Sequence, residues 1–312
     1  IIFSHLYDGA IISTREALQL EESRHGKGEW VTQEKANWLP KDKNIVDTAE
    51  ELNILSEAFV FVDDNPAERE IVSGQLGGTA VPEIGEVTDY IRVLDRSGYF
   101  ETVTLSEDDL KRNDMYRANA QRAKAQSRFA DYHDYLLSLE MTAEIGDFPP
   151  LYLQRITQLT NKSNQFNLTT KRYTAEQMEA VYNSDEYIRL YGKLYDKFGD
   201  NGVVAVTIGK TDSEDKGRLD IELWLMSCRV LKRDMELAML DSLVAQAKKR
   251  GIREIYGHYY PTAKNKMVAG LYESFGFEKI SQDEEGNTAW RLLVEGYEDK
   301  NTVIKVKEEH YA

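Results

Sequence analysis

The chain of 312 residues is long enough for two ordinary domains. Hydrophobic residues make up 41% of it and charged residues 30%, which is typical of a globular protein with a real core. Its 39 basic and 54 acidic residues give a net charge of −15, which argues against nucleic acid as the main partner, because phosphate binding depends on Lys and Arg. A single cysteine cannot form the disulfides typical of small secreted domains, and no apolar run has the length of a membrane span. We therefore expect a cytoplasmic protein without a membrane partner.

The first third of the chain predicts a strand, an acidic turn and a helix. Residues 1–30 show little periodicity, and a helical pattern then runs from Asn44 to about Leu52. The apolar run 58–62 is typical of a strand buried on both faces, and Pro66 opens the next helix at a position where it costs no hydrogen bond. Residues 86–99 predict one more helix of this part.

The rest of the chain predicts a helical connector and then an alternation of strands and helices. Ser106 is a suitable N-cap for a connecting helix over 107–130. Strands are expected at 141–145, 187–195, 203–210, 219–228, 252–259 and 288–293, and helices at 151–161, 174–182, 234–250 and 265–275.

The turn after the apolar run 58–62 carries two adjacent carboxylates, Asp63 and Asp64. Adjacent carboxylates repel one another, and oxygen ligation of a hard cation such as Mg²⁺ offsets that cost. Open α/β sheets also place their ligands at the carboxyl ends of strands. Asp63 and Asp64 are therefore candidate metal ligands, although the stretch is also a good turn and helix start.

Two stretches of this first part resemble the later motifs of a haloacid dehalogenase-type phosphatase, and more narrowly the FkbH-like family. They are Ala36-Asn37-Trp38-Leu39-Pro40-Lys41 and the run from Phe59 to Glu70 that contains Asp63-Asp64-Asn65-Pro66. The resemblance implies that Lys41 orients the nucleophile and the substrate phosphate, and that Asp63 and Asp64 help to hold Mg²⁺. The nucleophilic Asp-x-Asp motif of that superfamily does not occur in residues 1–40, and its Ser or Thr motif is not identifiable.

Four further stretches carry the FkbH-like resemblance into the second half. They are 164–173, 196–202, 224–230 and 261–265, and the likeness spans residues from about 36 to 280. In this family the second half is similar to GNAT-type acyltransferases. The resemblance implies an α/β chain: a partial haloacid dehalogenase-type (Rossmann-like) domain at 1–99, N-terminally incomplete, a helical connector at 100–135 and a GNAT-like mixed-sheet domain at 136–312.

In the GNAT fold the strands matching 219–228 and 252–259 splay apart, and a pantetheine arm lies between them. The loop after the first strand normally carries two glycines that let the backbone approach the coenzyme A pyrophosphate. Here Lys232 and Asp234 occupy the two glycine positions, and Asp234 repels phosphate. Coenzyme A therefore fits less well than the phosphopantetheine of a carrier protein.

Cys228 and His258 are the candidate catalytic pair of the second half, together with Lys41 and Asp63 of the first. Cys228 ends a strand beside Arg229, where a cation can stabilise a thiolate, and His258 ends the next strand, where it could act as a base. The family implies transfer of a glyceryl unit from 1,3-bisphosphoglycerate, a phosphorylated acyl donor, to an acyl carrier protein thiol. Cys228 is equally well explained as a small core residue, and His258 as a structural histidine.

The remaining candidates are polar residues near the expected site. Lys171 and Arg172 could hold a substrate phosphate, residues at 262–265 precede an expected helix start, and Tyr272 matches the general-acid tyrosine of many GNAT enzymes. As substrate-binding residues we expect Asn167, Thr169, Thr170, Lys171, Arg172, Arg229, Thr262, Lys264, Asn265 and Tyr272. Capping and packing also explain many of these residues.

Two alternatives to the acyl-loading enzyme stay open. One is a GNAT N-acyltransferase that uses acetyl-CoA, and the other is a non-catalytic protein that binds a carrier or a metabolite. The acyl group, the carrier and the oligomeric state do not follow from the residues.

Overall fold

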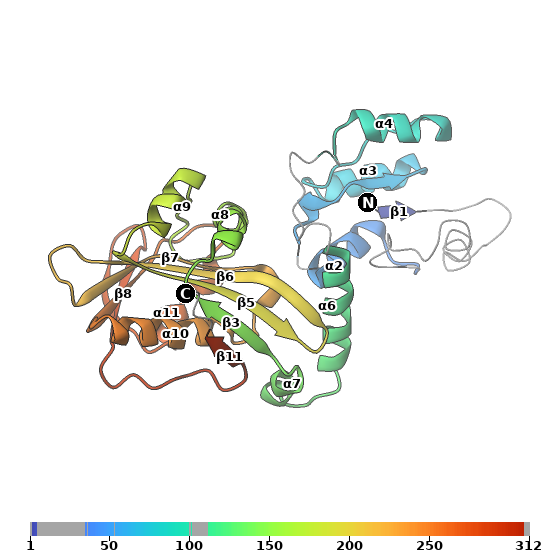
Figure 1. The fold of residues 1–312 in the computed structure, drawn as a ribbon. Helices are drawn as coiled ribbons and strands as arrows, with labels where there is room; N and C mark the ends of the chain where they lie inside the picture. Colours follow the sequence, from blue (N-terminus) through green and yellow to red (C-terminus); the bar gives the residue numbers. More distant parts are fainter. Residues whose placement is uncertain are drawn as a thin grey trace. The chain divides into compact units, whose positions relative to one another are not determined.

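The computed structural model describes residues 2–4, 35, 37–52, 54–99, 101 and 112–308. The chain divides into two compact units, residues 1–123 and 124–312, which are described separately (Figure 1). Within the described parts, no helix has the length and apolar character to cross a membrane.

The first unit is built around β2 (Phe61–Asp63), which pairs in parallel with β1 (Ile2–Ser4). Phe61 packs with residues of the flanking helices, whereas Val60 and Val62 belong to a second apolar cluster. The expected strand is thus confirmed as buried on both faces, although it begins later than predicted. The helices of this unit are α2 (Lys41–Leu52), α3 (Pro66–Gln75) and α4 (Tyr90–Arg96), with 3-10 turns at Ser56–Ala58 and Val87–Asp89.

The connector contains α6 (Arg112–Gln126) and α7 (Tyr132–Ser138). The expected N-cap, Ser106, lies outside the described residues. Asp131 caps α7 through the backbone N–H of Asp134, and Tyr135 joins the main core of the second unit.

The second unit is organised by a mixed sheet. Among the described residues nine strands follow the order β11-β3-β5-β6-β7-β8-β10-β9, with β4 attached to β7. The bounds are β3 (Thr142–Gly146), β4 (Phe166–Asn167), β5 (Tyr187–Asp196), β6 (Gly199–Thr211), β7 (Arg218–Met226), β8 (Glu254–Tyr259), β9 (Glu278–Gln282), β10 (Thr288–Leu293) and β11 (Lys305–Glu308).

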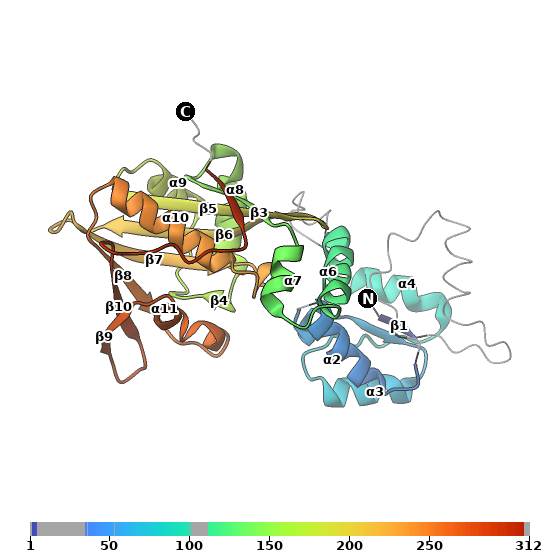
Figure 2. The same ribbon diagram turned by 90° about the horizontal axis from the view of Figure 1, so that it is seen from below.

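Helices cover both faces of this sheet. Figure 1 shows α8 (Leu153–Lys162) and α9 (Ala175–Tyr182) on one face, and α10 (Met235–Lys249) and α11 (Leu271–Ser274) on the other. Figure 2 shows α10 lying along the strands. Each face has its own apolar cluster, because residues alternate between the two sides of a strand. The expected mixed sheet is confirmed, whereas its likeness to the GNAT fold and the haloacid dehalogenase-type domain stay predictions.

Several of the described elements differ from the prediction. The expected helix over 265–275 is two short pieces, a 3-10 turn at Lys266–Val268 and α11, with Gly270 between them. β4, β9 and β11 were not predicted, because they are short and lack a clear apolar alternation.

Candidate functional site

The centre of the second unit is the place where two parallel strands diverge. β7 and β8 pair only over residues 218–220 and 254–256. On its other edge β7 shifts register against β6, because Ile208 pairs with Leu223 and Gly209 with Ile221. Glu222 is therefore the extra residue of a β-bulge, a feature that bends a strand and re-aims its side chains. The bulge at Glu222 thus lies two residues beyond Asp220, where the pairing of β7 with β8 ends.

A histidine and two charged partners lie at the start of the divergence. Arg218 donates both Nε and Nη2 to the Asp220 carboxylate, at 2.8 and 2.6 Å. His258 Nε2 lies 3.3 Å from Asp220 Oδ1 on the neighbouring strand. Burial opposes ionisation of Asp220, but the hydrogen bonds from His258 and Arg218 outweigh it and lower the Asp220 pKa. Asp220 thus holds the imidazole of His258 in one orientation, as a base requires.

Glu222 forms a second polar group beside the first. Lys171 Nζ lies 2.5 Å from Glu222 Oε2, and the Tyr173 hydroxyl donates to the same oxygen at 3.1 Å. Burial and the Glu222 charge raise the Tyr173 pKa, so this hydroxyl stays protonated at neutral pH. Glu222 keeps 23% of its side-chain surface exposed. It therefore presents a carboxylate to solvent next to the diverging strands.

The segment that follows α8 lies in the opening between the strands. Phe166 and Asn167 pair with Met226 and Leu225 of β7, and the Leu168 N–H donates to Trp224 O at 3.1 Å. On the other side, the backbone N–H of Tyr260, just beyond β8, donates to Leu168 O at 2.9 Å. The predicted substrate-binding residues Asn167 and Thr169 therefore lie within the sheet. Thr169 donates its hydroxyl to Glu222 O at 2.7 Å.

The turn from β7 to α10 has an unusual backbone. Cys228 is half-buried and begins a 3-10 turn (Cys228–Val230), and Arg229 Nε donates to Ser227 Oγ at 3.1 Å. Lys232 and Asp234 then adopt left-handed φ values of 61° and 59°. Such values are uncommon for residues other than glycine. The two positions that glycines occupy in the GNAT loop thus keep a glycine-type conformation.

A buried ion pair holds this turn in place. Arg233 is 8% exposed, and its Nη1 lies 3.2 Å from both Asp196 Oδ2 and Asn201 Oδ1. Its Nη2 donates to Arg229 O at 3.0 Å. Asp196 and Asn201 belong to the stretch 196–202, so this stretch supports the turn that contains Cys228. The Arg233 guanidinium is therefore engaged inside the fold.

Two carboxyl groups lie at the start of α10. Burial raises the pKa of Asp234, and burial raises the pKa of Glu236 to about 7. Glu236 Oε2 is buried without a hydrogen bond. The raised pKa values favour the neutral acids over carboxylates that would repel phosphate, so the expectation that coenzyme A pyrophosphate fits poorly here stays a prediction.

The structure does not bring Cys228 and His258 together. His258 contacts Asp220, and β7 runs a further six residues from Asp220 to Met226, which is about 20 Å of extended chain. Cys228 lies beyond that end. His258 contacts Asp220 near the start of β7, whereas Cys228 follows the end of β7, so the structure does not show the expected pairing.

The polar residues around β4 have structural contacts. Arg172 donates to the carbonyl oxygens of Thr160, at 3.0 Å, and of Asn161, and Lys171 is paired with Glu222. Thr170 has a left-handed φ of 54° and donates its N–H to Asn167 Oδ1 at 2.8 Å. Arg172 thus shapes the loop, whereas Lys171 pairs with the Glu222 carboxylate.

The residues expected at a helix start instead form a tight loop after β8. Asn265 is fully buried, and its Oδ1 accepts from Thr262 N at 2.7 Å and Thr262 Oγ1 at 3.0 Å. Its Nδ2 donates to Asn167 O and Tyr260 O, both at 2.9 Å. Lys264 is exposed and donates its N–H to Thr262 Oγ1 at 3.3 Å. Asn265 therefore ties β4 to the end of β8.

Tyr272 lies in the core, in contrast to its predicted role as an acid facing a substrate. It is 1% exposed and packs edge-on to Trp224 at 6.5 Å between ring centroids. A Cβ on Gly257 would collide with the Tyr272 ring, so this glycine permits the close packing. Burial raises the Tyr272 pKa, and the nearby His258 backbone N–H opposes that effect. The hydroxyl is too buried for direct exchange with solvent.

In the first unit, Lys41 and Asp63 do meet. Lys41 Nζ lies 3.6 Å from Asp63 Oδ2, and Asp63 Oδ1 accepts from Asn65 N at 2.9 Å. Asp63 is 2% exposed, whereas Asp64 is exposed. Ser4 stands opposite Asp63 in the β1–β2 register, at a position that the sequence did not identify.

The described part of this site does not by itself show a magnesium site, and magnesium binding stays a prediction. The described residues contain no group of three or more His, Cys, Asp or Glu side chains that could hold a metal. Asp63 Oδ2 is already opposite a lysine, and Mg²⁺ needs several oxygen ligands in near-octahedral geometry. No step through Mg²⁺ is therefore derived.

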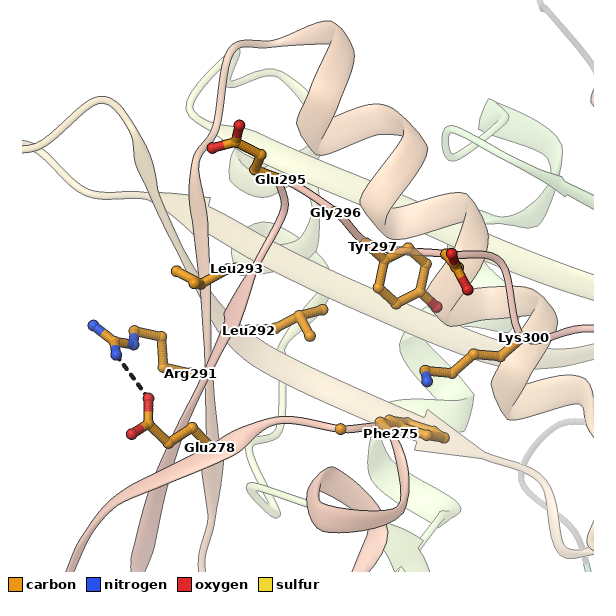
Figure 3. Close-up of a pocket in the computed structure, with 11 residues that line it drawn as sticks. Phe275, Glu278, Arg291, Leu292, Leu293, Glu295, Gly296, Tyr297 and Lys300 are labelled. Atoms are coloured by element: carbon orange, nitrogen blue, oxygen red, sulfur yellow. Dashed lines mark hydrogen bonds and ion pairs between the residues drawn. The ribbon is translucent and has the colours of Figure 1, made fainter.

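An open cavity of about 390 Å³ lies elsewhere in the second unit, beside β9, β10 and residues 295–300 (Figure 3). Its walls carry the ion pair between Arg291 and Glu278, at 2.7 Å, and the side chain of Lys300. No predicted site residue lines it.

No family model matches the chain, and no curated protein matches it. Solved acetyltransferase structures match about half of it. The ribosomal-protein-S18-alanine N-acetyltransferase from Escherichia coli is 13% identical, covering 52% of this chain and 99% of that one, with a TM-score of 0.38. The structure of yncA from Salmonella typhimurium with its cofactor acetyl-CoA is 14% identical, with coverages of 51% and 96% and a TM-score of 0.38. An acetyltransferase of the GNAT family from Streptococcus pneumoniae is 16% identical, with coverages of 48% and 99% and a TM-score of 0.37. Likeness at this level says nothing of a substrate, so the proposals below depend on the chain's own geometry.

Asp220 and Glu222 are the site residues that the sequence analysis missed. Both lie in a strand that was predicted, and Leu219 and Ile221, which flank Asp220, are fully buried. The alternation of charged and apolar residues over 218–221 is a signal that could have found Asp220. Glu222 depends on the bulge, which no local pattern reveals.

Proposed function

We propose that the second unit is an acyltransferase domain in which an acyl thioester is one of the reactants. The observation that carries the proposal is the divergence of β7 and β8 together with the turn that follows β7. That turn keeps left-handed φ values at Lys232 and Asp234 without glycine. Backbone strain of this kind persists only where the surrounding structure imposes it, and it clusters at functional sites.

Direct transfer from a thioester to an amine or alcohol is the first candidate reaction. Glu222 and the Asp220-oriented His258 are the groups that could accept a proton from the attacking acceptor. The test is release of free thiol from acetyl-CoA in the presence of a panel of amines. We expect Glu222→Gln or His258→Asn to lower the rate by at least about 100-fold, the usual lower size of a general-base contribution.

Glu254→Gln is the matched control for this test, since Glu254 is also a carboxylate of the diverging strands but pairs with Arg291. It should leave the rate unchanged. Equal rates for Glu222→Gln, His258→Asn and the wild type would exclude these two residues as bases. A complete absence of thiol release with every acceptor would exclude direct transfer from acetyl-CoA.

Covalent transfer through Cys228 is the second candidate, favoured by the half-buried position of this thiol at the end of β7 beside Arg229. The deprotonated sulfur would attack the carbonyl carbon of an acyl phosphate such as 1,3-bisphosphoglycerate, and the bond to the phosphate oxygen would break. The thiolate of a carrier phosphopantetheine would then take the acyl group and release Cys228.

Intact-mass measurement after incubation with 1,3-bisphosphoglycerate tests this second candidate. A gain equal to one 3-phosphoglyceryl group on the wild type (or one glyceryl group where the 3-phosphate is also released), absent from Cys228→Ser, would support it. An adduct that persists in Cys228→Ser, or no adduct on the wild type, would remove Cys228 from the mechanism. Phosphatase chemistry at Lys41 and Asp63 is part of the same FkbH-like hypothesis, and phosphate release by the longest available form of the protein would test it.

A further inference from the structure

Where β7 and β8 diverge, the backbone groups of β7 that face β8 need other hydrogen-bond partners. Beyond Asp220 the β8-facing edge of β7 loses its strand neighbour, and the residues there include the fully buried Trp224 and Leu225. Backbone groups buried away from water need partners. An extended arm with amide groups could supply them, in the way that a peptide adds to the edge of a sheet.

In this chain residues 166–169 already supply those partners. Their backbone pairs with β7 at Met226, Leu225 and Trp224. The Thr169 hydroxyl donates to the backbone oxygen of Glu222. They reach the other side of the opening as well, because Leu168 O accepts from the backbone N–H of Tyr260. The segment therefore spans the opening from one strand to the other.

The side chains of this segment are part of the core. Phe166 is 4% exposed and Leu168 is fully buried, and both belong to the main apolar cluster that includes Trp224 and Tyr272. Asn265, itself fully buried, holds the segment from outside the sheet by donating to Asn167 O. Withdrawal of residues 166–169 would expose two large apolar side chains and remove one of the two hydrogen bonds that the buried Asn265 amide donates. The segment is a fixed element of the fold and not a loose flap.

We infer that residues 166–169 are a specificity determinant that excludes an extended pantetheine arm from the space between β7 and β8. The inference rests on the proposed function, in which a thioester takes part. The arm must then approach over the surface that carries Glu222, Lys171 and His258, or from the Cys228 end of β7. The excluded class of ligand is a thioester arm that pairs with the edge of β7.

Hydrogen exchange on the wild-type chain is the first test, with coenzyme A and phosphopantetheine as probes. We expect slow exchange at the amides of Leu168 and Tyr260 without a probe, and no added protection at 222–226 with one. Rapid exchange at Leu168, or new protection at 222–226 on adding a probe, would overturn the inference. Because this measurement reports binding and opening, it is independent of whether any acyl transfer is observed.

A gain of binding is the second test. Phe166→Ala combined with Leu168→Ala removes the two side chains that anchor the segment in the core, so that its backbone can be displaced from β7. We expect coenzyme A to bind this variant at least 10-fold more tightly than the wild type, with protection appearing at 222–226. Leu243→Ala removes a fully buried side chain of the same core on α10 and is the matched control, with no gain expected. A folded double variant that binds coenzyme A no better than this control would also overturn the inference. Should the double variant fail to fold, the exchange result on the wild type decides alone.

Discussion

Two turns of this molecule occupy the same topological position, at the carboxyl end of a parallel strand and before a helix, and are built differently. The turn after β2 is stabilised locally, because Asn65 caps α3 through the N–H of Ala67 and Pro66 follows. The turn after β7 contains two residues with left-handed φ values, a buried acid and a buried ion pair. Local sequence preference builds the first turn, whereas contacts from other strands impose the second. The four predictions below probe that difference.

Removal of Arg233 should have the largest effect. Arg233→Met breaks the ion pair with the Asp196 carboxylate, whose side chain is 0% exposed, and we expect a loss of about 3–5 kcal/mol in unfolding free energy. Urea denaturation measures it. Lys232→Met, at the exposed neighbouring position, is the control and should cost about 0.5 kcal/mol or less. A loss in Arg233→Met no larger than in the control would show that the turn does not depend on the ion pair.

Glu236 should make stability depend on pH. Its folded pKa of about 7 is raised above the ordinary value of 4.5, so on raising the pH the unfolded chain ionises first. Stability is therefore lost as pH rises from about 4.5 to about 7, by up to roughly 3 kcal/mol. Glu236→Gln should recover that amount at pH 8 and little at pH 4, in denaturation curves taken at both values. Glu68→Gln, in the first turn of α3, is the comparison and should not change the slope.

Loss of the cap in the other turn should have a smaller effect. Asn65→Ala removes the oxygen that accepts from Ala67 N at 3.0 Å, and we expect about 1 kcal/mol of destabilisation. Thermal unfolding of the first unit is the measurement. Asn65→Asp keeps the accepting oxygen and should stay close to the wild type. If both variants lose the same stability, the cap is not the source of the effect.

Glycine substitutions should act with opposite sign in the two turns. Lys232→Gly and Asp234→Gly relieve the strain of a left-handed φ but increase the conformational entropy of the unfolded chain. We expect each to raise the unfolding free energy by about 0.5 kcal/mol net. Asp64→Gly relieves no such strain, because Asp64 lacks a left-handed φ. It should therefore lower the unfolding free energy by about 0.5–1 kcal/mol. Denaturation of the three variants side by side gives the comparison. Destabilisation by all three would show that the second turn is not strained.

Much of the second unit followed from periodicity. The strands around 187–195, 203–210 and 288–293 and the helix at 234–250 were placed within a few residues, because their apolar residues repeat at strand or helix spacing. β4 has only two residues and therefore no period to recognise. That short strand closes the opening at the centre of the site.

The sequence by itself determined where the chain alternates between strand and helix, that Asp63 and Asp64 follow a buried strand, and that Lys232 and Asp234 stand at glycine-type positions. Only the tertiary structure decided which side chains meet. Arg233 pairs with Asp196, 37 residues away in the sequence, and His258 contacts Asp220, 38 residues away. Cys228 lies just beyond the C-terminal end of β7. The physical reason is that local patterns set the period and the caps of an element, whereas the pairing of strands sets which charges share a buried space.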